Sequence, residues 1–253
     1  MPSPSDMHGK VALITGGGGG LGSATARKLA LCGAALCLVD RDEAGLTKIR
    51  AELVENGADV LCIAADIASA ERCKAVVDEA IAHFGRLDAL CNVAAIFVPC
   101  HFAEMSTEQW ERSMSVNLSA PAHLTQAALP QLIEHQGAVV NVTSCAAHIG
   151  QAYTVAYAAT KAGLTHLTKS LAMEYMHTGV RFNAVAPGGM MTMLAAGMRD
   201  LQDPDPSLVS RYHPLRGLVE IDDVADMVAF LATDAASGYH GAVINIDKGI
   251  TAG

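Results

Sequence analysis

Residues 9–33 read GKVALITGGGGGLGSATARKLALCG, and five glycines in a row, Gly16 to Gly20, separate an apolar run from a helical pattern. A glycine inside regular structure costs about 0.5–1 kcal/mol relative to alanine, so a run of five needs a physical reason. Either the run forms a loose turn, or its bare backbone lets N–H groups approach a bulky anion. The residues on both sides have to decide between the two.

Composition and charge narrow the range of functions. The chain has 253 residues, 51% hydrophobic and 17% charged, which suits one large core. Its net charge of −9 argues against nucleic acid, anionic membranes or an acidic carrier protein as the main partner. The sequence contains no run of about 18 apolar residues, which is the length that a membrane-spanning helix requires. The opening MPSPSDMHGK lacks the apolar stretch of a secretory signal, so we expect a cytoplasmic protein with a disordered tail over residues 1–8.

The cysteines and histidines do not indicate a metal site. Seven cysteines form no CxxC pair and lie mostly among apolar neighbours, which favours small buried side chains in a reducing compartment. The ten histidines are scattered and show no HExxH spacing. We therefore expect no metal.

Short apolar runs alternate with longer helical patterns along the chain. Seven runs are predicted to be buried strands: 11–15, 35–40, 60–66, 89–95, 138–144, 180–188 and 242–247. Helices are predicted over 21–32, 42–56, 69–84, 106–134, 153–178 and 222–233. Strands that are apolar throughout and separated by helices predict an α/β fold, a doubly wound, seven-stranded parallel sheet with helices on both faces. We expect one domain over 1–253, with the irregular segment 188–218 as a substrate lid.

The glycines then occupy the first strand-to-helix turn of such a sheet, where a pyrophosphate binds at a helix N-terminus. Asp40 ends the second strand, about twenty residues further on, where a carboxylate can accept hydrogen bonds from an adenosine ribose. Asp40 could instead cap the next helix. The order of strand, turn, helix and acid favours cofactor binding.

Tyr157 and Lys161 lie four residues apart on one face of a predicted helix. A nearby ammonium favours the phenolate, lowers the pKa of the phenol and makes it a usable acid and base. Ser144 ends a strand at the carboxyl edge of the sheet, where α/β folds bind ligands. Taken singly, the pair could be a solvated helix face and Ser144 a helix cap.

Together, TGGGGGLG, Asn117 in SVNLSA, Ser144 and the Tyr157-Ala-Ala-Thr-Lys161 motif resemble the short-chain dehydrogenase/reductase family in its single-domain, Rossmann-type form, over essentially the whole chain. The resemblance implies Tyr157 as general acid/base and Lys161 as its pKa tuner and ribose ligand. It implies that Ser144 polarises the substrate oxygen and that Asn117 anchors a proton-relay water. It also implies that Gly17, Gly18 and Gly19 fill variable positions.

The resemblance also implies the cofactor contacts. These are expected from Thr15, Gly16, Gly20, Leu21, Gly22, Asp40, Arg41, Asp66, Ile67, Asn92, Ala94, Tyr157, Lys161, Pro187, Gly188 and Thr192. Two motifs depart from the family pattern. Asn92-Val93-Ala94-Ala95 replaces the usual Asn-Asn-Ala-Gly, which affects a sheet-stabilising side chain and the approach of residue 95 to the cofactor. Asp247-Lys248-Gly249 replaces Asp-Gly-Gly in a segment that often lies at subunit contacts.

The substrate is expected to be a small or moderately apolar secondary alcohol or its ketone, since no Arg or Lys cluster marks a polyanion site. Candidate substrate contacts are Ser144, Cys145, His148, Tyr153, Tyr157, Met191, Met193 and Leu194. Further candidates are Phe97, His101, Met190 and Met198. Methionines adapt to irregular apolar ligands, but several of these residues could equally pack the lid or a subunit interface.

Three functions remain open. The leading one is an NAD-dependent alcohol dehydrogenase, because Asp40 would repel a 2′-phosphate and Gly19 supplies no positive charge. A 3-ketoacyl-thioester reductase using NADPH is less favoured on an acidic chain. A catalytically silent dinucleotide-binding protein would not need Ser144, Tyr157 and Lys161. The family's habit of pairing the helices at 106–134 and 153–178 implies a homotetramer.

Overall fold

The structure is a computed structural model that describes residue 3 and residues 5–192, 197–212, 214 and 216–252. Seven parallel strands form one sheet in the order β3-β2-β1-β4-β5-β6-β7. Their bounds are β1 Val11–Thr15, β2 Ala35–Asp40, β3 Val60–Ala64, β4 Ala89–Asn92, β5 Ala138–Val142, β6 Arg181–Pro187 and β7 Val243–Ile246. The predicted seven-stranded, doubly wound parallel sheet is confirmed, because the order reverses direction between β1 and β4.

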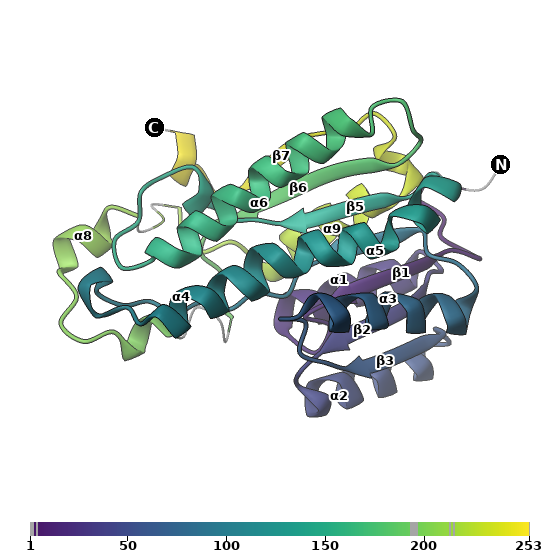
Figure 1. Ribbon diagram of the computed structural model, residues 1–253, viewed down its shortest axis with the longest axis horizontal. Helices are drawn as coiled ribbons and strands as arrows, with labels where there is room; N and C mark the ends of the chain where they lie inside the picture. The colour runs from purple at the N-terminus through teal and green to yellow at the C-terminus, as the bar shows by residue number, and fades with distance from the viewer. Residues whose placement is uncertain (1–2, 4, 193–196, 213, 215, 253) are drawn as a thin grey trace.

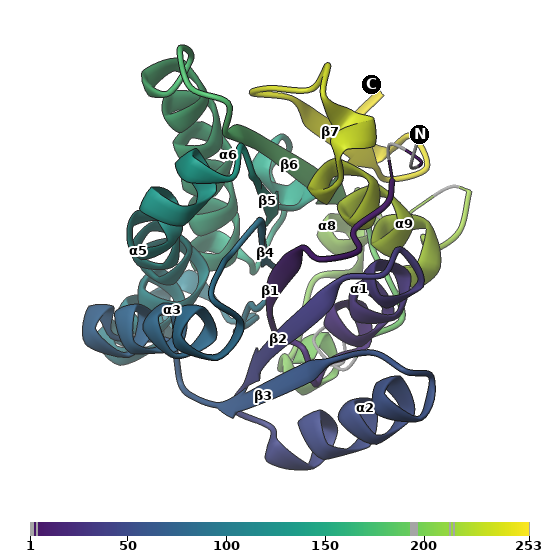
Figure 2. The same ribbon diagram turned by 90° about the vertical axis from the view of Figure 1, so that its right-hand side faces the viewer.

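Helices cover both faces of the sheet (Figure 1). Figure 2 shows α3 Ala70–Phe84, α5 Ala120–Glu134 and α6 Val155–Glu174 on one face, and α1 Gly20–Leu31, α2 Glu43–Glu55 and α9 Ile221–Ala232 on the other. The strands contribute side chains to the hydrophobic core on both faces of the sheet. In β1, Ala12 and Ile14 pack on the face covered by α1, and Val11 and Leu13 pack on the face covered by α3. This alternation explains why the strands are apolar throughout.

The predicted helix over 106–134 has an interruption. It consists of α4 Thr107–Met114, a π-helical turn at Ser115–Ser119 and α5. A capping box between Ser106 and Gln109 starts it. The π turn widens the helix at Asn117, and such turns are frequent at functional sites.

The helix predicted over 153–178 is shorter at both ends, because α6 runs from Val155 to Glu174. Tyr153 has a φ of 67°, which lies in the left-handed region and cannot continue a right-handed helix. Short helical segments also follow β6: a 3₁₀ turn at Gly197–Asp200 and α8 at Pro206–Ser210.

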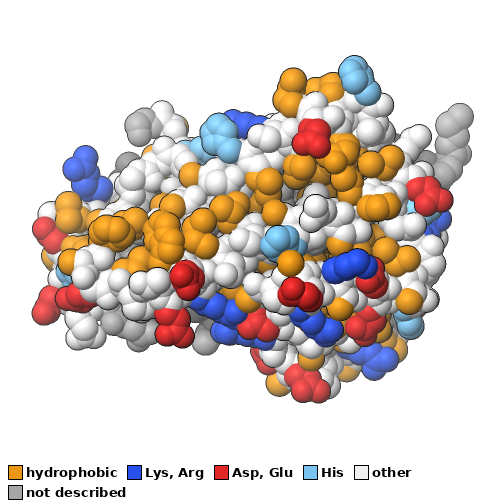
Figure 3. Space-filling view, viewed as in Figure 1, with side chains coloured by type: hydrophobic (Ala, Val, Ile, Leu, Met, Phe, Trp, Pro, Cys, Tyr) orange, Lys and Arg blue, Asp and Glu red, His pale blue; other side chains and the backbone are white. Residues whose placement is uncertain are grey.

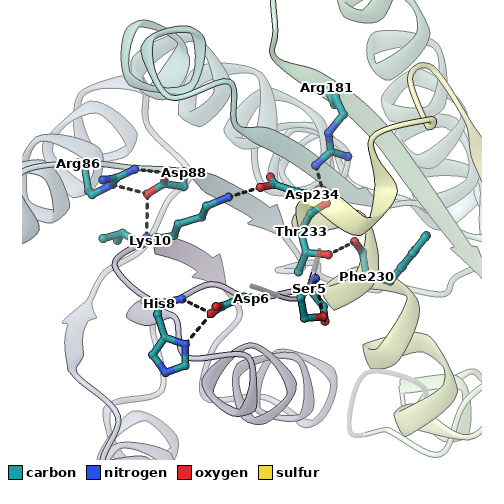
Figure 4. Close-up of polar contacts among 12 residues, drawn as sticks. Ser5, Asp6, His8, Lys10, Arg86, Asp88, Arg181, Phe230, Thr233 and Asp234 are labelled. Carbon is teal, nitrogen blue, oxygen red and sulfur yellow. Dashed lines mark hydrogen bonds and ion pairs between the residues drawn. The ribbon is translucent and has the colours of Figure 1, made fainter. Parts of the chain in front are cut away.

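The amino edge of the sheet is closed by polar contacts, several of which Figure 4 shows. Buried Asp88 accepts hydrogen bonds from the backbone N–H of Val11 at 2.9 Å and from Arg86, and Lys10 pairs with Asp234 at 2.6 Å. Within the segment expected to be a tail, Met7 is only 1% exposed and its N–H donates to the Cys32 carbonyl at 2.7 Å. The part of segment 1–8 around Met7 is therefore packed against the protein. The edge of the sheet that remains open is the opposite one, at the carboxyl ends of the strands.

Candidate active site

A cleft of about 900 Å³ lies along the carboxyl edge of the sheet. Most of the predicted cofactor and catalytic residues line it, although they come from seven separate parts of the chain. The lining includes Gly16, Gly20, Leu21, Gly22, Asp40, Arg41, Asp66, Ile67, Ala94, Ser144, Tyr157, Lys161, Pro187, Gly188 and Thr192. Residues chosen from local motifs thus meet in one place.

The glycine loop forms one end of this cleft. Gly16 has a φ of 71°, which disfavours a side chain, and a Cβ on Gly22 would lie 2.0 Å from the Gly16 carbonyl oxygen. Helix α1 begins at Gly20 without a side-chain cap and without an acidic residue in its first turn. Its first N–H groups are therefore suited to an anion such as a pyrophosphate.

The other loop glycines are not freely variable. A Cβ on Gly17 would lie 2.9 Å from the Leu38 Cβ, and one on Gly18 would lie 3.1 Å from the Leu46 nitrogen. Gly17 and Gly18 thus let the loop pack against β2 and α2. Gly19 is different, because a Cβ there would meet only the Gly16 carbonyl oxygen, at 3.4 Å.

Asp40 lies at the end of β2 and holds the glycine loop. Its carboxylate accepts hydrogen bonds from the N–H groups of Gly18 and Asp42, each at 3.0 Å. Asp42, not Asp40, caps α2 through the Gly45 N–H. The helix-cap interpretation of Asp40 is therefore wrong, and its carboxylate lines the cleft with its neighbour Arg41.

Asp66 marks the same end of the cleft and is paired with Arg112 of α4, Nη2 to Oδ2, at 2.7 Å. This hydrogen bond lowers the pKa of the Asp66 carboxyl below its usual value. Arg112 also lines the cleft, and the sequence interpretation missed it. No local signal could have found Arg112, since the pair joins residues 46 positions apart.

Thr15 and Asn92 do not line the cleft but lie directly behind it. The Thr15 hydroxyl accepts hydrogen bonds from the N–H groups of Val93 and Ala94, both at 3.1 Å. The Asn92 amide donates to Asn141 Oδ1 at 2.8 Å, a contact between β4 and β5. The side chain that the altered motif replaces is the one at Val93. Ala95 lines the cleft, so its methyl group stands where the family pattern has a bare glycine.

Tyr157 and Lys161 lie on one face of α6, with Ser144 opposite at the end of β5. Lys161 is 2% exposed, its Nζ donates to the Val142 carbonyl at 2.7 Å, and it lies 5.6 Å from the centre of the Tyr157 ring. Burial lowers the pKa of Lys161 to about 7. Burial raises the pKa of Tyr157 to about 12, while a hydrogen bond with Ser144 acts to lower it.

A protonated Lys161 favours the phenolate of Tyr157, because a nearby positive charge stabilises the charged form of the phenol. The Ser144 hydroxyl accepts from the Ala146 N–H at 3.1 Å and so also caps the 3₁₀ turn at Cys145–Ala147. Ser144 therefore both caps this turn and lines the cleft. This arrangement can transfer a proton to or from an oxygen held at Ser144.

Asn117 is buried in the π turn, behind the cleft. Its Oδ1 accepts from the Ile96 N–H at 2.8 Å, and its Nδ2 donates to the Ile96 carbonyl at 2.9 Å and to the Thr160 hydroxyl at 3.3 Å. The side chain thus holds the loop after β4. A water relay would have to use the Asn117 backbone.

The predicted substrate contacts are only partly found at the cleft. Ser144, Tyr157, Phe97 and Met190 line it, whereas Cys145, His148, Tyr153 and Met191 do not, and Met191 is 75% exposed. Tyr153 instead accepts a hydrogen bond from the Asp205 N–H at 2.8 Å. Met193 and Leu194 lie outside the described residues.

In the part of the chain that the structure describes, no three His, Cys, Asp or Glu side chains gather as metal ligands. Over the same residues, none of the helices combines the length and apolar character that crossing a bilayer requires.

A doubly wound parallel sheet with a glycine loop, a strand-end acid and a Ser-Tyr-Lys set in one cleft defines a dinucleotide-dependent oxidoreductase. Residues 17–251 match the family described as enoyl-(acyl carrier protein) reductase. The chain belongs to the short-chain dehydrogenase/reductase family.

Three relatives are similar to this chain over nearly their whole length. A cis-4-hydroxycyclohexanecarboxylate dehydrogenase from Sinomonas cyclohexanicum is 38% identical, covering 96% of this chain and 97% of the relative. A 2,5-dichloro-2,5-cyclohexadiene-1,4-diol dehydrogenase from Sphingobium indicum is 35% identical, with 98% of both chains covered. A cyclohexanol dehydrogenase from an Acinetobacter species is 35% identical, covering 97% and 96%.

Solved structures agree with the fold. Levodione reductase superposes with a TM-score of 0.89 at 33% identity, covering 97% of this chain and 99% of its own. A 3-ketoacyl-(acyl-carrier-protein) reductase from Brucella melitensis, complexed with NADH, gives 0.87 at 30%, covering 97% and 100%. A Beutenbergia cavernae protein described as a putative gluconate 5-dehydrogenase, with bound NADP, gives 0.89 at 31%, covering 99% and 100%. The chain is thus an oxidoreductase of this family, whose three relatives above are named as dehydrogenases and two of whose structural neighbours hold NADH or NADP.

Proposed function

We propose that the chain is an NAD-dependent dehydrogenase that interconverts an alicyclic secondary alcohol and its ketone. The observation that carries this proposal is the meeting of Ser144, Tyr157 and Lys161 in the cleft that Asp40 and the glycine loop also line. A protein that only bound a dinucleotide would have no use for a buried lysine beside a phenol, so the catalytically silent alternative is not favoured.

When bound, the nicotinamide supplies the acceptor for a hydride from the carbinol carbon. Ser144 donates a hydrogen bond to the substrate oxygen and orients it toward Tyr157. The Tyr157 phenolate takes the hydroxyl proton during oxidation and returns it during reduction. Lys161 stabilises the phenolate and would hold the nicotinamide ribose, and the Asn117 backbone would anchor the water that connects the pair to solvent.

Asp40 supports the choice of NAD over NADP. Its carboxylate lies at the rim of the cleft, fixed by two backbone N–H groups, where it can accept from a ribose 2′-hydroxyl. A 2′-phosphate at that place meets like charge. The neighbouring Arg41 favours NADP, because an arginine can contact a 2′-phosphate. We expect the fixed carboxylate of Asp40 to outweigh this one flexible side chain.

An alicyclic substrate is supported by the apolar end of the cleft and by the relatives. Ile96, Phe97, Val98 and Met190 line the cleft, and the Phe97 ring lies against that of Tyr157. Three relatives carry names that contain a cyclohexane or cyclohexadiene ring. The 3-ketoacyl-thioester reductase remains the second candidate, since one structural neighbour has that activity in its name.

We further propose a homotetramer. Hydrophobic side chains gather on the face formed by α4, α5 and α6 (Figure 3). Exposed members on or beside these helices are Trp110, Ile133, Val155, Met173 and Met176. Symmetric pairing would bury them. Light scattering at micromolar concentration tests this directly, and a monomeric mass would contradict it.

All seven cysteines are free, which supports a reducing, cytoplasmic location.

The test of the proposed activity is cofactor reduction, followed at the nicotinamide absorbance, with NAD or NADP and a panel of alcohols. The panel contains cyclohexanol, an acyclic secondary alcohol and a 3-hydroxyacyl thioester. We expect the highest kcat/KM with NAD and cyclohexanol. A preference for the thioester with NADP would favour the second candidate instead.

A further inference from the structure

Phe97 stands between the catalytic tyrosine and the segment that follows β6. Its ring lies edge to face with that of Tyr157, with centroids 5.0 Å apart and planes at 84°. On its other side it faces Gly197, where an added Cβ would lie 3.6 Å from the Phe97 carbonyl oxygen and 3.7 Å from its Cδ1. Both residues line the cleft.

The loop that carries Phe97 is held at both ends. Asn117 binds both backbone polar groups of Ile96, the preceding residue, at 2.8 and 2.9 Å. Further along, the Cys100 N–H donates to the Tyr153 carbonyl at 3.0 Å, and the His101 ring donates to the Gln202 carbonyl at 3.0 Å. A ring on a loop fixed in this way forms a wall with a set position.

Gly197 packs closely against this wall. An alanine there would make ordinary van der Waals contact, because the nearest atoms to its Cβ, in Phe97 and Pro99, are at 3.6–3.7 Å. The φ of Gly197 is not among the positive values, so a side chain brings no backbone strain. Residue 197 thus packs directly against Phe97, and no substrate ring fits between the two residues.

We propose that Phe97 is the specificity-determining residue that limits the size of the ring accepted beside Tyr157. This inference rests on the proposed function, because it assumes an alicyclic alcohol as substrate. Phe97 packs against one side of a single substrate ring. A second ring fused to it would collide with the Phe97 side chain.

The test compares cyclohexanol with decahydro-2-naphthol, which has two fused rings. A change of even one methylene in an apolar pocket alters discrimination by about 10- to 200-fold. Phe97→Ala should therefore raise the ratio of kcat/KM for the bicyclic over the monocyclic alcohol by about tenfold or more. Gly197→Ala should leave the same ratio unchanged, because the added methyl group makes only ordinary contact with Phe97. The KM for the cofactor should not move in either variant.

Phe102→Ala is the matched control, since Phe102 lies on the same segment, is 64% exposed and does not line the cleft. Its size ratio should equal that of the parent. If Phe97→Ala lowers kcat/KM equally for both alcohols, Phe97 has only a structural role and the proposal is overturned.

A second readout separates this proposal from the proposed function. The melting temperature with NADH and cyclohexanone, or with NADH and 2-decalone, reports binding without turnover. Should the parent oxidise neither alcohol while Phe97→Ala alone gains stabilisation by 2-decalone, the proposed activity fails and the role of Phe97 stands. If neither ketone raises the melting temperature of the parent or of Phe97→Ala, the role of Phe97 fails as well.

Discussion

The preference for NAD is predicted to depend on the charge of Asp40. In Asp40→Ala the cleft loses the acceptor for a ribose 2′-hydroxyl, and the N–H groups of Gly18 and Asp42 lose their partner at 3.0 Å. In Asp40→Asn the charge is removed and one side-chain oxygen remains, so only one of these two N–H groups can keep its partner. The two variants therefore separate the effect of charge from the effect of the hydrogen bonds that hold the loop.

The size of the effect follows from two contributions. A hydrogen bond to a charged group contributes about 1.5–3 kcal/mol, so NAD should lose roughly 10- to 150-fold in kcat/KM with Asp40→Ala. For NADP, two unit charges 4 Å apart near a protein surface repel by about 4 kcal/mol, which salt and partial exposure reduce to about 1–2 kcal/mol, or roughly 5- to 30-fold. The ratio of NADP to NAD activity should thus rise roughly 50- to 4,500-fold, the product of the two contributions.

The assay is kcat/KM for NAD and NADP with one alcohol at low and high salt, beside the melting temperature of each variant. Asp40→Asn should gain most of the NADP activity while losing less stability than Asp40→Ala. Adding Gly19→Arg to Asp40→Ala should raise NADP activity further, because a Cβ at residue 19 has room. If the ratio stays within about twofold of the parent in well-folded variants, well short of the expected effect, Asp40 does not select the cofactor.

Three further predictions follow from burial and close contact. Because burial lowers the pKa of Lys161 from 10.5 to about 7, the unfolded chain binds the extra proton between these values. The free energy of unfolding of the cofactor-free parent should therefore rise relative to Lys161→Met as pH increases above about 7, by at most about 1.4 kcal/mol per pH unit; chemical denaturation measures it, and a flat difference would contradict the shift. Gly22→Ala should abolish measurable cofactor binding in calorimetry, since its Cβ would lie 2.0 Å from the Gly16 carbonyl oxygen, whereas unchanged affinity would disprove the close approach. Asp88→Ala, at the opposite edge of the sheet, should reduce the free energy of unfolding by about 3–5 kcal/mol without altering the KM of folded enzyme; a loss below about 1 kcal/mol would mean that its hydrogen bonds to Val11 and Arg86 contribute little.

The sheet and the cofactor end of the cleft could be predicted because their determinants are local. The glycine loop lies between a strand and a helix that are adjacent in the chain, and Asp40 ends the next strand. The four-residue spacing of Tyr157 and Lys161 puts them on one helix face whatever surrounds the helix. For such residues the sequence pattern already determines the position in the fold.

Contacts between distant segments could not be predicted in this way. Arg112 reaches Asp66 across 46 positions, and Phe97 meets residue 197 from another part of the chain. Tyr153, four residues before Tyr157, is a predicted substrate contact, yet its positive φ keeps it out of α6 and its hydroxyl accepts a hydrogen bond from the Asp205 N–H. Proximity in the chain to a catalytic residue therefore says little about which side chains line the substrate end.

The central claim is that Tyr157 transfers the proton in an NAD-dependent oxidation of a secondary alcohol. The most direct measurement is the rate of NAD reduction with cyclohexanol by the parent and by Tyr157→Phe, which removes only the hydroxyl. We expect turnover by the parent and a loss of about 100- to 10,000-fold in kcat for the variant, with the affinity for NAD unchanged in calorimetry. Turnover by Tyr157→Phe within a few-fold of the parent would contradict the assignment.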